Sequence, residues 1–201
     1  MQQIISQFIN GIHQTSWLEF IAVVTGIASV IFSRKENILV YPVGMISTGI
    51  FIGLYITHGL YADASVNFYY TVMSIIGWVM WSKKTDGKTV LIITASSNRD
   101  RRNAFIFFII CWVILYLLLR HFTDSTVPIA DSFTSAAAFT GMWLMNKKKL
   151  ENWTWWIITD LASIPLNFYK HLVFTSFQYL VFLILALMGY ITWRKKTVHA
   201  A

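Results

Sequence analysis

The chain has 201 residues, of which 56% are hydrophobic and only 12% are charged. Because soluble domains carry about 25% charged residues, this composition excludes a soluble globular protein and indicates an integral membrane protein. The formal net charge of +7 does not indicate a nucleic-acid partner, since the basic residues lie in short clusters between long apolar runs. The single cysteine, Cys111, excludes a disulfide framework and a cysteine-based metal site.

Residues 1–15 lack the basic region and the small-residue cleavage site of a signal peptide. Their apolar positions recur at helical spacing: Ile4, Ile5, Phe8, Ile9 and Ile12. We therefore expect a short interfacial helix here.

The remaining chain contains apolar stretches long enough to cross about 30 Å of hydrocarbon. They are predicted at 16–33, 38–57, 62–81, 104–120, 126–145, 152–170 and 174–193. If all seven cross, only Arg120 and Lys170 of the 16 basic residues lie on one side of the membrane. The positive-inside rule then places the N-terminus outside and the C-terminus in the cytoplasm.

Parts of the sequence repeat. The octet GWVMWSKK (77–84) resembles GYITWRKK (189–196) at a shift of 112, and TG (25–26, 140–141) and EN (36–37, 151–152) recur at a shift of 115. We expect an all-α membrane protein with two parallel three-helix bundles joined by a linker helix, the 3+1+3 arrangement of SWEET-type transporters. The predicted units are 1–15, 16–81, 82–125 (loop and linker helix), 126–196 and a cytoplasmic tail, 197–201.

Several predicted spans carry a polar and aromatic face. Within 152–170, one sector of roughly 100° on a helical wheel holds Trp153, Trp156, Asp160, Ser163, Asn167 and Lys170. A carboxylate at a helix centre costs about 2.5–3.5 kcal/mol on insertion scales, so Asp160 is expected to face a substrate path. Other spans add Thr48, Asn67, Tyr70 and Gln178. The predicted substrate-binding residues are Thr48, Asn67, Tyr70, Trp153, Trp156, Asp160, Asn167 and Gln178.

Alternative roles exist for some of these side chains. Trp78, Trp81 and Trp193 lie beside lysines at span ends, where tryptophan is typically an interfacial anchor, and Trp153 fits either role. Asn67 and Gln178 also fit hydrogen bonding between helices.

A face of this kind favours a particular class of ligand. Aromatic rings attract a cationic or electron-poor ring, with cation–π attraction of up to about 2 kcal/mol, and a buried carboxylate adds a preference for positive charge. No Lys or Arg occupies a mid-span position, so nothing would neutralise a phosphate there. We expect a small, cationic, heteroaromatic, unphosphorylated molecule, with no metal and no cofactor. An intramembrane enzyme is disfavoured, because the chain lacks the HExxH and GxSxG motifs and paired mid-span aspartates.

Five segments resemble the PnuC vitamin transporters: SWLE (16–19), LYAD (60–63), GWVMW (77–81), DS (131–132) and ENWTWWIITD (151–160). The resemblance implies facilitated diffusion of nicotinamide riboside across the bacterial cytoplasmic (inner) membrane and trapping by a cytoplasmic vitamin kinase. It implies ring stacking by Trp153 and Trp156 and polar contacts from Asn67 and Gln178. The segment VPIA before Asp131 lacks the aromatic residue common in the family. Thiamine remains an alternative substrate, because some relatives carry it. Proton-coupled transport remains an alternative to facilitated diffusion, and a SWEET-type sugar carrier remains an alternative class of transporter. A homo-oligomer also remains open.

Overall fold

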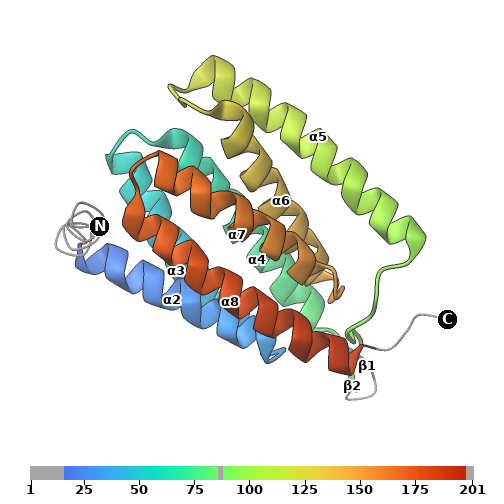
Figure 1. Cartoon of the computed structure of the whole chain (residues 1–201). Helices are drawn as coiled ribbons and strands as arrows, with labels where there is room; N and C mark the ends of the chain where they lie inside the picture. The colour runs from blue at the N-terminus through green and yellow to red at the C-terminus, as the bar shows by residue number, and fades with distance from the viewer. Residues whose placement is uncertain (1–15, 86–87, 198–201) are drawn as a thin grey trace.

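The computed structural model describes residues 16–85 and 88–197 and contains seven long helices in this part of the chain (Figure 1). These are α2 (Trp17–Arg34), α3 (Val40–Thr57), α4 (Tyr61–Ser82), α5 (Asn98–Phe122), α6 (Pro128–Asn146), α7 (Asn152–Tyr169) and α8 (Val173–Lys196). A short hairpin of β1 (Lys84–Thr85) and β2 (Lys88–Thr89) follows α4. The interfacial helix expected at 1–15 and most of the expected tail lie outside the described residues.

The helices pack as two groups of three with one helix between them in the sequence. In the first bundle α3 packs against both α2 and α4, and in the second bundle α7 packs against both α6 and α8. The bundles meet reciprocally, because α2 packs against α8 and α4 against α6. The linker helix α5 packs on α6 at the edge of the molecule (Figure 1). The predicted 3+1+3 all-α architecture is therefore confirmed.

The helix lengths fit a bilayer. Helices α2, α3, α5 and α8 are long and apolar enough to cross a membrane by length and composition. The other three have 22, 19 and 18 residues; at 1.5 Å per residue they reach about 27–33 Å. Their polar side chains lower their hydropathy, and two of them, α4 and α6, pack against each other across the two bundles.

The two bundles correspond at a constant shift of 112 residues. At this shift the first and last residues of α3 correspond to the first and last residues of α7. The residues with positive φ that follow equivalent helices also correspond: Glu36 (φ 55°) to Lys148 (φ 50°), and Gly59 (φ 74°) to His171 (φ 61°). The octet match at 112 is therefore the structural repeat. The TG and EN matches at 115 do not occupy equivalent positions, and reading them as part of the repeat was wrong.

Equivalent tryptophans join the bundles at the end of the molecule where α2, α4, α6 and α8 terminate, called here the basic end. Nε1 of Trp81, on α4, donates to the carbonyl oxygen of Asn146 on α6 at 3.2 Å. Reciprocally, Nε1 of Trp193, on α8, donates to the carbonyl oxygens of Ser33 and Arg34 on α2, each at 3.2 Å. These carbonyls belong to last helical turns, whose oxygens lack partners within their own helix. Each tryptophan therefore caps the first helix of the opposite bundle.

These contacts correct the expected role of two tryptophans. Trp81 and Trp193 are 5% and 0% exposed, so they are not anchors in the lipid interface. Trp78, one turn from Trp81, is 41% exposed and has the accessibility that an anchor needs. A position beside lysines at a helix end does not distinguish the two cases, because an indole N–H is satisfied equally well by water or by a helix carbonyl.

A matched pair of glycines lets these rings pack closely. A Cβ at Gly77 would lie 2.3 Å from the ring of Tyr41, and a Cβ at Gly189 would lie 2.6 Å from the ring of Trp153. Each of these rings also meets the capping tryptophan of its own bundle edge-on, at 5.2 Å in the first bundle and 5.6 Å in the second. Trp153 is thus the repeat equivalent of Tyr41 in a buried aromatic core at the basic end.

Candidate functional site

The candidate site is centred on the carboxylate of Asp160, in the middle of α7. Asp160 is 3% exposed, and in the described part of the chain no hydrogen bond or ion pair satisfies its carboxylate. Its oxygens are nevertheless not among the fully enclosed polar atoms that lack a partner, so they keep some accessible surface. An unpaired carboxylate in this position is costly to bury, which is the usual mark of a functional group in a membrane protein.

Aromatic rings from three helices lie beside this carboxylate. Trp156, one turn before Asp160 on α7, lies 6.4 Å from the ring of Tyr70 on α4. Tyr70 in turn meets Phe139 of α6 edge-on at 5.9 Å. Phe139 also stacks on Tyr69 at 3.8 Å, and the Tyr69 hydroxyl donates to the Phe139 carbonyl oxygen at 3.2 Å. These rings form an aromatic cluster between the two bundles.

A glycine sets the position of the Trp156 ring. A Cβ added at Gly141 of α6 would lie 3.1 Å from Trp156 Cε2, tighter than an ordinary van der Waals contact. The indole therefore lies directly against the α6 backbone, with its position fixed by close packing.

Two tyrosines also lie near the carboxylate. Tyr179 of α8 and Tyr70 of α4 both lie within electrostatic range of Asp160. Tyr179 was not among the residues expected from the sequence. A repeat shift of 112 pairs it with Asn67, so the octet match applied along the whole chain would have identified it. Phe139 and Gly141 carried no sequence signal of a binding site, because Phe139 belongs to an apolar run and Gly141 stood out only through the TG match.

The predicted polar residues that form printed hydrogen bonds use partners within their own bundle. Thr48 of α3 and Thr71 of α4 share a hydrogen bond of 2.7 Å, and at a shift of 112 Thr48 is the equivalent of Asp160. Asn67 and Asn167 donate to backbone oxygens of their own helices, at 2.9 and 2.8 Å. Gln178, on α8, is half-buried. Their part in binding remains a prediction.

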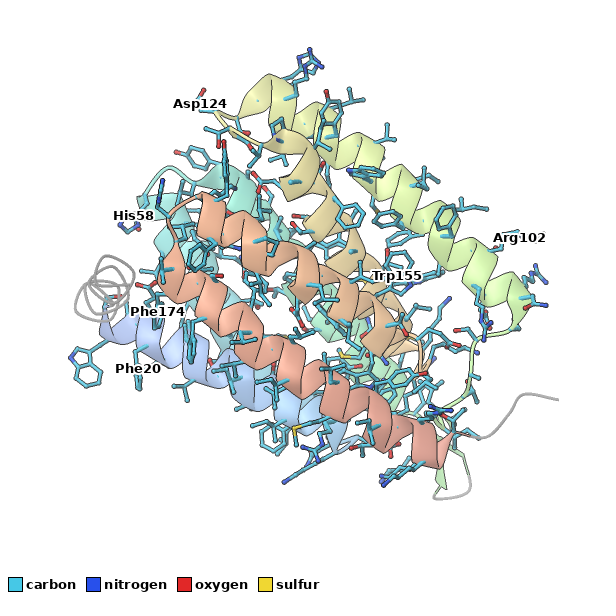
Figure 2. The ribbon with its side chains drawn as sticks, viewed as in Figure 1. Phe20, His58, Arg102, Asp124, Trp155 and Phe174 are labelled. Carbon is cyan, nitrogen blue, oxygen red and sulfur yellow. The ribbon has the colours of Figure 1, made fainter. Side chains whose placement is uncertain are left out.

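The two remaining tryptophans of the 152–160 segment point elsewhere. Trp153 is 1% exposed and is enclosed by the aromatic core at the basic end, so it is not free to stack on a ligand in this conformation. Trp155 packs on Phe108 of α5 at 4.9 Å, on the side of the second bundle away from the site (Figure 2). The structure thus brings Trp156, Asp160 and Tyr70 together and leaves Trp153 and Trp155 in packing positions.

No basic side chain lies at the depth of Asp160 in the described helices. Lys170, at the end of α7, forms an ion pair with Asp131 near the start of α6. Arg120 bonds the hydroxyl of Tyr116 near the end of α5, at 2.7 Å. Across residues 16–85 and 88–197 no group of three or more His, Cys, Asp or Glu is placed to hold a metal ion. The site therefore offers a negative charge, ring faces and hydroxyls.

Comparisons with known proteins agree with the observed fold. Residues 16–195 match the model of the nicotinamide mononucleotide transporter family. The chain is 26% identical to the nicotinamide riboside transporter PnuC of Neisseria mucosa, covering 90% of this chain and 73% of that protein. It is 22% identical to the riboflavin/roseoflavin transporter RibM of Streptomyces davaonensis, covering 88% and 84%.

The fold has a solved counterpart. A crystal structure of the vitamin B3 transporter PnuC superposes with a TM-score of 0.72 at 24% identity, covering 96% of this chain and 87% of that one. At this identity the likeness concerns the fold. Together with the family match over 16–195, it shows that the chain belongs to the nicotinamide mononucleotide transporter family and is a multi-pass membrane transporter of the PnuC type, for a vitamin-type substrate, and not an enzyme.

Proposed function

We propose that this protein carries nicotinamide riboside across the bacterial cytoplasmic membrane by facilitated diffusion. The observation that carries the proposal is the unpaired, buried carboxylate of Asp160 beside the Trp156 and Tyr70 rings. Nicotinamide riboside has a flat pyridinium ring with a permanent positive charge. The rings supply stacking and cation–π attraction, and the carboxylate supplies the counter-charge.

The same site disfavours the phosphorylated form of the vitamin. A phosphate group would enter a space that holds a carboxylate and has no Lys or Arg at its depth in the described helices. Its burial without a counter-charge is unfavourable. Phosphorylation by a cytoplasmic kinase would then trap the vitamin inside the cell, because the product no longer fits the carrier.

Transport requires the basic end to open. Side-chain bonds between the bundles concentrate there: besides the tryptophan bonds, Glu36 pairs with Lys148 at 3.5 Å and with Lys196 at 2.8 Å. We propose that this end faces the cytoplasm, since it carries most of the Lys and Arg residues. The structure then corresponds to a state closed toward the cytoplasm, and release of the vitamin requires these contacts to separate as one bundle rocks against the other.

The test is solute exchange in proteoliposomes, which contain no kinase. Liposomes holding the purified protein and unlabelled nicotinamide riboside should take up the labelled riboside until the two sides equilibrate. An imposed pH gradient should leave the initial rate unchanged. The mononucleotide should compete at least about 100-fold more weakly, the equivalent of about 2.7 kcal/mol.

Riboflavin and thiamine serve as the other arms of this experiment. Riboflavin is uncharged and larger, so it gains nothing from Asp160, whereas thiamine is also a heteroaromatic cation. Exchange of riboflavin or thiamine in preference to nicotinamide riboside would overturn the proposed substrate. Accumulation driven by a pH gradient would overturn facilitated diffusion.

A further inference from the structure

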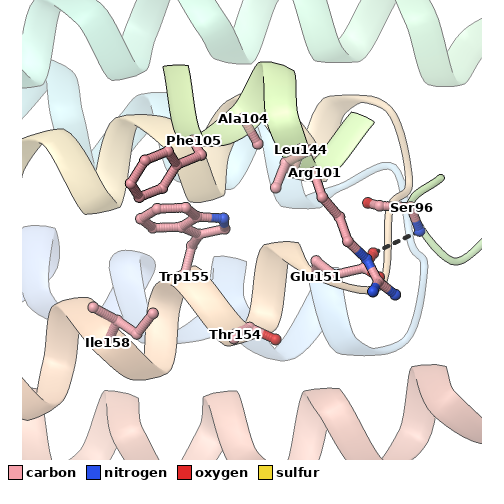
Figure 3. Close-up of a pocket in the computed structure, with 9 residues that line it drawn as sticks. All are labelled: Ser96, Arg101, Ala104, Phe105, Leu144, Glu151, Thr154, Trp155 and Ile158. Carbon is pink, nitrogen blue, oxygen red and sulfur yellow. Dashed lines mark hydrogen bonds and ion pairs between the residues drawn. The ribbon is translucent and has the colours of Figure 1, made fainter. Parts of the chain in front are cut away.

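A pocket lies apart from the candidate site, between α5 and the second bundle (Figure 3). Its volume is about 220 Å³. Both α5 and α7 begin at the basic end, so the pocket opens there, at the level where the lipid headgroups of that leaflet would lie. The segment before α5 is held in place by Thr94, whose backbone bonds Lys148 and Leu150 at 3.2 and 3.0 Å. The pocket is therefore bounded by fixed backbone on this side.

The wall of the pocket has two chemically distinct halves (Figure 3). Ser96, Arg101 and Glu151 form the polar half, which lies toward the membrane edge. Phe105, Trp155 and Ile158 belong to the apolar half, which lies further along α5 and α7 from the basic end. This order suits a molecule with a polar head and an apolar chain.

An unused hydroxyl lies in the polar half. Ser96 is 6% exposed, and its Oγ is buried without a hydrogen-bond partner among the described residues. Its backbone N–H is already used, since it donates to Glu151 Oε2 at 2.8 Å. Buried hydroxyl groups in native proteins are nearly always satisfied. Ser96 lines the pocket, so a rotation about its Cα–Cβ bond would turn the enclosed hydroxyl toward a ligand that accepts its hydrogen.

The charges beside this hydroxyl favour an anion. Glu151 is neutralised by Arg101 at 3.3 Å, and Asp100 is neutralised by Lys149 at 3.1 Å. The Arg101 side chain is still 62% exposed, and its guanidinium has N–H groups beyond the one that bonds Glu151. Arg99 and Arg102 add exposed positive charge to the same turn of α5.

We propose that this pocket binds one anionic phospholipid. The phosphate accepts hydrogen bonds from the Ser96 hydroxyl and the Arg101 guanidinium, and one acyl chain lies along Phe105, Trp155 and Ile158. Because α5 packs on α6 and its Arg101 pairs with Glu151 at the start of α7, a lipid in this position would reinforce the existing contact between the beginning of the linker helix and α7. The bound lipid would then act as a structural part of the second bundle.

Native mass spectrometry of the detergent-purified protein, titrated with phosphatidylglycerol or phosphatidylcholine, tests this proposal. We expect one retained phosphatidylglycerol molecule and a clearly weaker phosphatidylcholine complex. Arg101→Gln should weaken phosphatidylglycerol binding about tenfold, because it removes a charge-assisted hydrogen bond. Arg102→Gln is the matched control: it removes the same charge from the next residue, which does not line the pocket, and should change binding less than about twofold.

Ser96→Ala keeps the Arg101–Glu151 ion pair and removes the hydroxyl, so it should weaken binding about fivefold. Glycerol phosphate, which lacks acyl chains, should not displace the lipid, because it cannot use the apolar half. Equal retention of the two lipids, equal effects of Arg101→Gln and Arg102→Gln, or unchanged binding by Ser96→Ala would each overturn the proposal. In those cases the lipids would be held only by diffuse surface charge.

Discussion

Replacing Asp160 by Asn tests the central element of the proposed site, because the change keeps the side-chain shape and removes only the charge. The carboxylate is 3% exposed and has no ion-pair partner among the described residues. A cation about 5 Å away would gain about 3 kcal/mol from it at an effective dielectric constant of about 20. Since the cation also loses part of its hydration, we expect a net loss of about 1–3 kcal/mol in Asp160→Asn, or roughly 5- to 150-fold in affinity.

The measurement compares two ligands of nearly equal size. Nicotinamide riboside carries the pyridinium charge, whereas its reduced dihydropyridine form is uncharged. Calorimetry should show the full loss for the cation and less than about a threefold change for the neutral form. Asp124→Asn, which removes a carboxylate from an exposed position after α5, should leave both affinities unchanged.

Two results would refute this reasoning. Equal losses for the charged and the neutral ligand would mean that Asp160 shapes the site and does not supply charge. Unchanged binding of both ligands would mean that the carboxylate does not face the ligand. A folding defect is not expected to obscure the comparison, because removing an unpaired buried charge should leave the thermal unfolding midpoint unchanged or higher.

Three other measurements test the remaining assignments. Trp156→Ala should lose about 1–3 kcal/mol of substrate binding, and Trp156→Phe should recover part of this loss. Trp155→Ala should bind the substrate normally but unfold at a lower temperature. Equal binding losses in the two alanine variants would refute the assignment of Trp156, and not Trp155, to the face of α7 that binds the substrate. Gly189→Ala places a Cβ 2.6 Å from an indole ring and should destabilise the fold by about 1–3 kcal/mol, whereas Gly49→Ala, where a Cβ meets nothing within 4 Å, should be close to neutral. A reporter fused after Lys196 should locate to the cytoplasm and one at the N-terminus outside; matching locations would contradict seven spans.

The sequence predicted the helices well because bilayer thickness constrains them strongly. Most predicted spans end within three residues of the observed helices, for example 38–57 against Val40–Thr57 for α3. The exception is α5, predicted at 104–120, which begins six residues earlier at Asn98. Ser97 and Asp100 form a capping box there, so a polar turn continues the helix beyond its apolar part. Hydropathy identifies only the part of such a helix that requires lipid or protein around it.

The site was harder to predict, because a helical wheel gives a direction but not a neighbour. It correctly separated Trp156 from Trp155, which face different helices. It could not distinguish Trp153 from Trp156, since both lie on one face of α7. What distinguishes them is depth along α7: the first meets Gly189 and the aromatic core at the basic end, and the second, about one turn further from that end, meets Gly141 of α6. That information lies in the packing of neighbouring helices.

The comparison of the two repeats separates the scaffold from the chemistry. Positions 81 and 193 are both tryptophan, positions 77 and 189 are both glycine, and positions 41 and 153 are both aromatic, so the closure at the basic end is nearly symmetric. At mid-helix the symmetry fails: position 48 is threonine and position 160 is aspartate. A symmetric closure allows the two bundles to separate as equivalent halves. A single carboxylate, in contrast, gives the space between them one negative side, so a cationic ring should bind in one orientation, with its charge toward α7.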